Sequence, residues 1–124
     1  MILAYNRRMR LAGLTLETEF FEDYLSFLTE VLELDLKELT DISMRLDLQN
    51  TWLEIKKVPA AHQVATTVMF ALKQLEYEAL VQKVSFFYYR KGPSRFLFLG
   101  ADEDCCQLVD PDGRVWRFQL EPTV

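Results

Sequence analysis

The sequence predicts an α+β fold in which two similar modules follow one another along the chain. Three observations lead to this prediction: an amphipathic helical stripe, short segments in which apolar and polar residues alternate, and an order of helix and strands that occurs twice. At 124 residues, half of them hydrophobic, the chain has the size of a single domain with a real core, here placed over residues 1–124. The modules are expected over about residues 9–58 and 63–120.

The first module is predicted to contain a strand, a helix and further strands. A strand is expected over residues 9–17, and Thr18 is placed to cap the helix that follows. The apolar side chains of this helix recur every three or four residues and form one stripe: Phe21, Tyr24, Leu25, Leu28, Val31 and Leu32. Alternation predicts strands over residues 42–49 and 52–57, and residues 34–39 leave room for a kinked or doubled second strand.

The second module is predicted to repeat this order. A strand is expected over residues 64–72, and a helix over residues 75–84 with Leu75, Ala79 and Leu80 directed inward. Residues 86–90 admit two interpretations, because their aromatic content slightly favours a strand whereas the helix could also run on to a C-terminal Gly92. The remaining strands are expected over residues 96–99, 106–109 and 115–120.

The ends of the two modules can be superposed. Asp110-Pro111-Asp112-Gly113 has proline and glycine at the places that a type I turn favours. Residues 49–55 then fall on residues 112–118, turn over turn and strand over strand, and Glu54 corresponds to Arg117. Two βαβββ modules side by side, each with its helix on the outer face, would form a curved mixed sheet, a cup suited to a ligand.

Composition excludes several classes of function. A net charge of −5 argues against a nucleic-acid partner, since duplex binding needs clustered Lys and Arg. No segment has the length of apolar sequence that a membrane span needs, and the start lacks a signal-peptide core, so we expect a cytoplasmic protein. The two cysteines, Cys105 and Cys106, are adjacent, which disfavours a disulfide between them.

Two segments carry a resemblance to a known family. Residues 27–34 look like an aromatic-x-x-x-Val-Leu-Gly-Leu helix end, and residues 110–118 look like a final turn and strand. On these segments nearly the whole chain resembles the vicinal-oxygen-chelate superfamily of glyoxalases, bleomycin-resistance proteins and extradiol dioxygenases. Glu33 stands where that family usually has glycine. A left-handed backbone at Glu33 would cost about 1 kcal/mol, unless the helix simply runs on.

The resemblance also implies where a ligand would lie. Metal-using members take His, Gln or Glu ligands from the first and last strands of each module, and the corresponding positions here are Gly13, Glu54, Thr67 and Arg117. A shift of five residues would bring His62 to the third position. Only Glu54 is a competent ligand and a guanidinium would repel a cation, so we expect no metal ion and no other cofactor.

Glu54 and Arg117 admit two interpretations within such a cup. They either form an ion pair across its floor, which is a structural role, or Arg117 holds an anionic ligand through its planar fork.

The function expected from the resemblance is metal-free binding of a small organic ligand by a homodimer similar to the bleomycin-resistance branch. No catalytic residue is assigned, and we expect a binding protein rather than an enzyme. The acidic character of the chain would suit a cationic ligand. Two alternatives stay open: a metal-dependent lyase or dioxygenase with a different ligand set, and a structural or regulatory dimer whose cup is filled by side chains.

Overall fold

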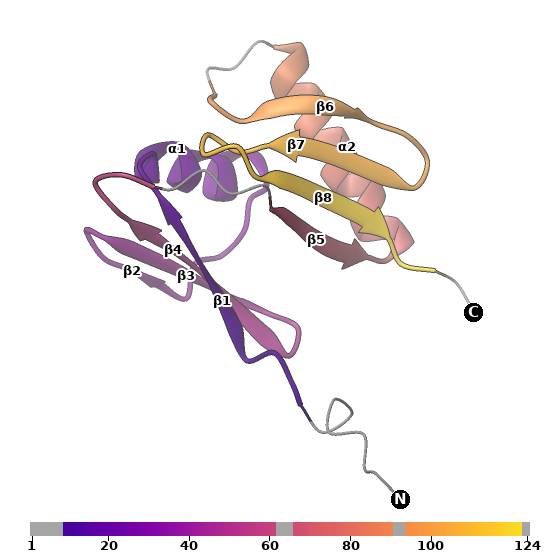
Figure 1. Cartoon of the computed structure of the whole chain (residues 1–124). Helices are drawn as coiled ribbons and strands as arrows, with labels where there is room; N and C mark the ends of the chain where they lie inside the picture. Colours follow the sequence, from indigo (N-terminus) through magenta and orange to yellow (C-terminus); the bar gives the residue numbers. More distant parts are fainter. Residues whose placement is uncertain (1–8, 62–65, 91–93, 123–124) are drawn as a thin grey trace, which may run out of the picture.

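The computed structural model describes residues 9–61, 66–90 and 94–122, and its strands form two four-stranded sheets (Figure 1). The first module contains β1 (Gly13–Thr18), α1 (Phe21–Ser26), the π-helical turn η2 (Phe27–Val31), β2 (Glu38–Leu39), β3 (Ser43–Leu48) and β4 (Thr51–Lys57). The second contains β5 (Thr67–Leu72), α2 (Gln74–Tyr89), β6 (Leu97–Ala101), β7 (Cys105–Val109) and β8 (Val115–Leu120).

The two sheets have the same topology. Their strand orders are β1-β4-β3-β2 and β5-β8-β7-β6, and in each the first strand of the module pairs in parallel with the last. The α+β fold class and the tandem modules are therefore confirmed. Among the residues that the structure describes, no helix combines the length and the apolar character needed to cross a membrane.

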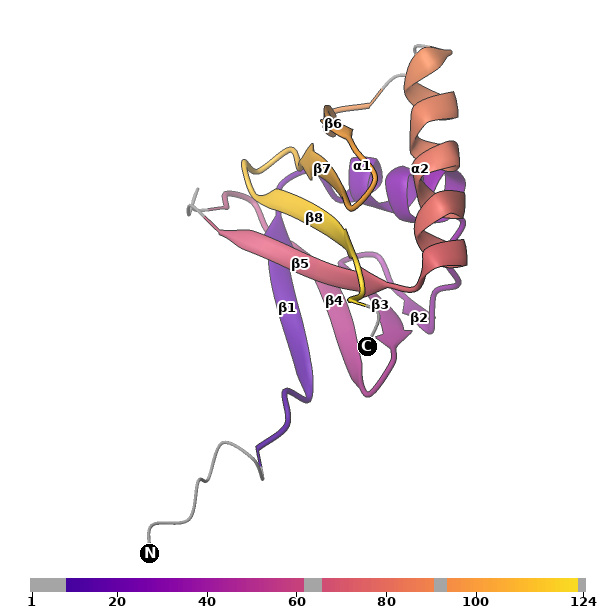
Figure 2. The same cartoon turned by 90° about the vertical axis from the view of Figure 1, so that its right-hand side faces the viewer.

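Both sheets contribute to one hydrophobic core. Leu53 and Ile55 of β4 and Trp116 and Phe118 of β8 are all buried in it. The π-helical turn η2 contacts the second module from this side, since Phe27 stacks on the ring of Phe96, just before β6, with centroids 4.0 Å apart. Figure 2 shows both helices on the same side of the second sheet. Because strand side chains alternate, the opposite face of each sheet, here called its free face, points away from the core.

The first helix begins later than the sequence predicted. Thr18 pairs with Lys57 as the last residue of β1, and the helix starts at Phe21. The hydroxyl of Thr18 accepts a hydrogen bond from the backbone N–H of Phe20 at 2.9 Å instead of capping the helix. The prediction of Thr18 as the N-cap is wrong, because strand pairing holds this residue in the sheet.

Helix α2 differs from the prediction in its length and in its buried face. It runs to Tyr89, so residues 86–89 are helical and the strand that their aromatic content favoured is wrong; the Gly92 considered as the helix cap lies outside the described residues. Leu75 is 76% exposed and Ala79 is also exposed, whereas Tyr77 and Val84 are buried. The predicted inward face is therefore wrong for the first two residues, and Leu80 is half-buried. Burying the ring of Tyr77 turns the helix, and its hydroxyl donates to the carbonyl of Asp102 at 2.9 Å.

The predicted turn before β8 is present and encloses a buried carboxylate. Gly113 has a φ of 92°, and its N–H donates to the carbonyl of Asp110 at 3.0 Å. The carboxylate of Asp110 accepts hydrogen bonds from the hydroxyl of Tyr24, the indole N–H of Trp116 at 3.0 Å and the guanidinium of Arg114 at 3.2 Å. It also accepts the backbone N–H groups of Asp112 and Arg114. A buried charge needs such partners to offset its desolvation.

This cluster joins the two modules. Tyr24 belongs to α1, and the guanidinium of Arg114 donates to the carbonyl of Glu17 in β1 at 2.6 Å. Burial and the neighbouring Asp110 raise the pKa of Tyr24, so its phenol stays protonated and can donate. Burial alone lowers the pKa of Arg114, but Tyr24 and Asp110 raise it by more, and the guanidinium stays charged. Hydrogen bonds thus join the turn of the second module to the strand β1 and the helix α1 of the first module.

The end of the first helix confirms the left-handed alternative at Glu33. This residue has a φ of 56°, and the N–H of Leu34 reaches back to the carbonyl of Leu28 at 2.9 Å. Glycine is preferred at such a C-terminal position because it has no Cβ. The side chain of Glu33 forms only a surface ion pair with Lys83 at 3.2 Å.

We expect Asp110→Asn to destabilise the fold by about 3 kcal/mol, because Arg114 loses the nearer of its two buried counterions, Asp112 remaining at 3.6 Å, and because its donors and that of Trp116 then face an amide. Urea denaturation measures this loss. The control is Asp47→Asn, which removes an exposed carboxylate paired with Arg45 and should change the free energy of unfolding by less than about 0.5 kcal/mol. Similar stability of the two variants would contradict a central role for Asp110.

We expect Glu33→Gly to stabilise the protein by about 1 kcal/mol, since it relieves a left-handed backbone at the loss of an exposed ion pair. Glu33→Gln is the matched control, because it removes the charge and keeps the Cβ. Thermal and urea unfolding of the two variants should rank glycine above glutamine. A glycine variant that is no more stable than the glutamine variant would show that the backbone at this position carries no strain.

Candidate functional site

The four predicted site residues lie on the free faces of the two sheets, two on each. Gly13 of β1 pairs with Trp52 of β4, and Glu54 follows two residues further along β4. Along each strand these positions alternate with residues that face the core, such as Leu53 in β4. The first sheet therefore carries Gly13 and Glu54 on one surface.

The second sheet repeats this register. Thr67 of β5 pairs with Val115 of β8, and Arg117 follows two residues further along β8. The correspondence of Glu54 with Arg117, inferred from the superposed sequences, thus matches the strand pairing in both modules.

A single chain does not bring Glu54 and Arg117 together. Glu54 accepts a hydrogen bond from the hydroxyl of Thr15 at 3.0 Å, and the Nε of Arg117 donates to the sulfur of Cys105 at 3.2 Å. Within the described ranges no ion pair joins Glu54 to Arg117. Both side chains point away from the shared core, so the ion pair considered across the floor of a cup is not formed within one chain.

The position of Gly13 is covered by an aromatic side chain. A Cβ built on Gly13 would lie 1.9 Å from Cε2 of Trp52, so only glycine fits beneath this indole. The guanidinium of Arg45 lies 4.8 Å from the centroid of the same ring. Sequence reasoning did not find Trp52 and Arg45 as part of this surface, although a glycine inside a strand often marks a close approach of another group. No donor atom is available where the family resemblance places its first metal ligand.

Metal-ligating side chains do not gather in the part of the chain that the structure describes. No group of three or more His, Cys, Asp or Glu residues there could hold a metal ion. His62, considered as an alternative ligand, lies outside the described residues.

The free face of the second sheet mixes polar and apolar side chains, with Gln107 on one side of Arg117 and Met69 on the other. Met69, Leu97 and Leu99 are each more than half exposed on it. Cys105, which is half-buried beside Arg117, and the buried Cys106 are both free thiols. Burial raises the pKa of Cys106 to about 11, so this thiol stays protonated and serves as a packing residue.

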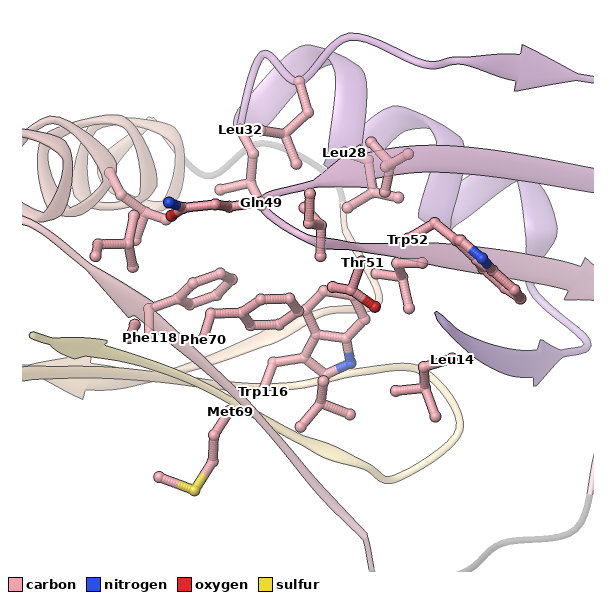
Figure 3. A pocket seen from close by; sticks show the side chains of 18 of the residues that line it. Leu14, Leu28, Leu32, Gln49, Thr51, Trp52, Met69, Phe70, Trp116 and Phe118 are labelled. Atoms are coloured by element: carbon pink, nitrogen blue, oxygen red, sulfur yellow. The ribbon is translucent and has the colours of Figure 1, made fainter. Parts of the chain in front are cut away.

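A separate cavity lies between the core faces of the two sheets. It has a volume of about 430 Å³ and is lined from β1, η2, β3, β4, β5, α2 and β8. Figure 3 shows Phe70, Phe118 and Trp116 together on one side of it, with Leu28 and Leu32 on the other. Sequence reasoning did not find this cavity, because its lining comes from distant elements that meet only when the modules pack.

Comparison with known proteins relates the chain to others through its fold. No protein-family model matches the sequence, and no curated protein matches it. Among solved structures, a bleomycin resistance determinant encoded on the transposon Tn5 is 18% identical, with a TM-score of 0.64 over 93% of this chain and 100% of that chain. A glyoxalase-related enzyme from Fulvimarina pelagi is 15% identical, with a TM-score of 0.65 over 92% and 89% of the two chains.

A third structure contains a metal ion. The fosfomycin resistance protein FosX from Listeria monocytogenes, complexed with Mn(II) and sulfate, is 11% identical, with a TM-score of 0.66 over 91% of this chain and 90% of that chain. The resemblance to the vicinal-oxygen-chelate superfamily is confirmed by these structures as a likeness of fold.

Proposed function

We propose that this chain, which has the fold of glyoxalase-related and bleomycin-resistance proteins, binds a small organic molecule without a metal ion and does so as a homodimer. One observation carries the proposal. Glu54 and Arg117 are half-buried, their hydrogen bonds go to the neutral groups of Thr15 and Cys105, and they lie on free faces that one chain cannot bring together. A second copy of the chain completes the site.

The two free faces are complementary to each other. The face of the first sheet offers the carboxylate of Glu54, which lies opposite Arg45 in the pairing of β3 with β4, and the face of the second offers the guanidinium of Arg117, with exposed apolar side chains elsewhere on the same face. When the first sheet of one chain covers the second sheet of its partner, opposite charges come together and apolar surface leaves the water. A twofold axis produces this arrangement twice, so a dimer has two equivalent sites.

The groups at this surface suit an organic ligand better than a metal ion. Divalent cations of the zinc, iron or manganese kind need three or four donors, whereas Glu54 is the one competent ligand among the four positions and a guanidinium stands at the last. The planar fork of Arg117 binds a carboxylate in a bidentate way. Thr67 would lie at the edge of the site, and the indole over Gly13 offers a flat apolar surface. We place this binding function in the cytoplasm and assign it no catalytic step.

The competing account is a structural or regulatory dimer with a filled interface. It is favoured by the bulk of Trp52 over Gly13 and by the opposite charges of Glu54 and Arg117, which could neutralise each other directly. The two accounts share the dimer and differ in whether an added carboxylate competes for Arg117.

A charge exchange tests the dimer. Sedimentation velocity should find a dimer for the unmodified chain, weaker association for Glu54→Arg and for Arg117→Glu, and restored association for the double variant, because like charges repel in each single variant. Glu22→Arg, a charge reversal at an exposed position of α1, is the control and should leave association unchanged. A monomer at all concentrations, or a double variant weaker than both single ones, would contradict the proposed pairing of the free faces.

Thermal unfolding of chelator-treated protein tests the metal-free site. If the native protein bound Mn²⁺ or Zn²⁺, a concentration of a thousand times the Kd would stabilise the fold by about 4 kcal/mol and raise the Tm clearly. We expect no change in Tm with either ion. Benzoate, used as a carboxylate probe, should stabilise by about 1.4 kcal/mol at ten times its Kd, and this shift should vanish in Arg117→Gln. A metal shift abolished by Glu54→Ala would refute the metal-free site. Absence of any benzoate shift would favour the filled dimer.

A further inference from the structure

The cavity between the modules has a lining that contrasts with both free faces. Apart from Gln49 and Thr51, every residue that lines it is apolar, and none of the lining residues carries a charge. The volume of about 430 Å³ lies within the usual range of small-molecule sites, which is roughly 300–1,000 Å³. Because a charged ligand would lose its hydration here without gaining a counterion, the lining favours an uncharged molecule.

One wall of the cavity is aromatic. The rings of Phe70 and Phe118 are stacked with centroids 5.1 Å apart and an interplanar angle of 15°. The indole of Trp116 lies 5.3 Å from Phe70 at 33°. Since the indole N–H of Trp116 already donates to Asp110, Trp116 offers only its apolar ring atoms to a ligand. Such a wall suits a planar ring that stacks in an offset manner.

The opposite wall and the opening complete the site. Leu28 and Leu46 are buried in the opposite wall, while Leu14 is 39% exposed at its outer part. The side-chain amide of Gln49 is exposed and provides a donor and an acceptor for a polar group of the ligand. Met69 and Trp52 belong to the free faces and also line the cavity, but Figure 3 shows both directed away from the three rings, so the aromatic wall is distinct from the free faces.

We propose that this cavity binds one uncharged aromatic molecule per chain, of roughly two or three rings, with a hydroxyl or carbonyl group directed toward Gln49. The site goes beyond the proposed function, because all of its lining belongs to one chain and it uses neither Glu54 nor Arg117. It therefore binds its ligand in the monomer as well as in the dimer.

Fluorescence titration with N-phenyl-1-naphthylamine, an uncharged aromatic probe, tests the site. We expect saturable binding of one probe per chain, displacement by 2-naphthol, and displacement by 2-naphthoate at least tenfold weaker because of its charge. Leu48→Trp places a larger side chain at the cavity and should weaken binding of the probe at least tenfold. Leu39→Trp, the same change at an exposed residue of β2 outside the lining, should leave binding unchanged.

Two further variants keep the test decisive. Phe70→Leu removes one ring of the wall and should weaken binding of 2-naphthol even if the larger tryptophan at position 48 prevents folding. Arg117→Gln should leave binding unchanged, which separates this site from the one between free faces. The proposal would be overturned by probe binding that does not saturate, by equal displacement with 2-naphthol and 2-naphthoate, by binding only in the dimer, or by loss of binding in Arg117→Gln.

Discussion

The buried carboxylate of Asp110 is the constraint on which the arrangement of the two modules depends. Its partners come from the turn before β8, from β8 and from the first helix, and Arg114 extends the cluster to the carbonyl of Glu17 in β1. Burying this carboxylate without hydrogen-bond donors would destabilise the folded state. The elements that carry the donors must therefore pack around Asp110. The core faces of both sheets are thereby held together around Tyr24 and Trp116.

When the core faces of the two sheets pack together, the free faces lie on the outside of the chain. This consequence explains why the register that places Glu54 and Arg117 at equivalent positions does not create a site inside one chain. Each module carries half of a surface, with Glu54 on one half and Arg117 on the other. A second chain can join them by symmetry, whereas a rearrangement within one chain would have to break the cluster around Asp110.

The same packing creates two environments of opposite character. On the free faces, charged groups keep contact with water, and Trp52 fills the space above Gly13. Between the modules, aromatic rings such as Phe70 and leucine side chains enclose a cavity without charge. Ligands that suit one environment are poorly matched to the other, since Arg117 on the free face can bind a carboxylate, whereas the cavity would desolvate a carboxylate without a counterion.

The sequence by itself determined the features that depend on local periodicity. It predicted most strands, the turn that begins at Asp110, the correspondence of Glu54 with Arg117 and the left-handed alternative at Glu33, because these follow from alternation, turn chemistry and backbone sterics. Tertiary structure alone decided which face of α2 is buried, since the more apolar Leu75 is exposed whereas packing and the contact with Asp102 bury Tyr77. It also decided the outward direction of the free faces and the cavity between the modules, because both result from contacts between segments far apart in the chain.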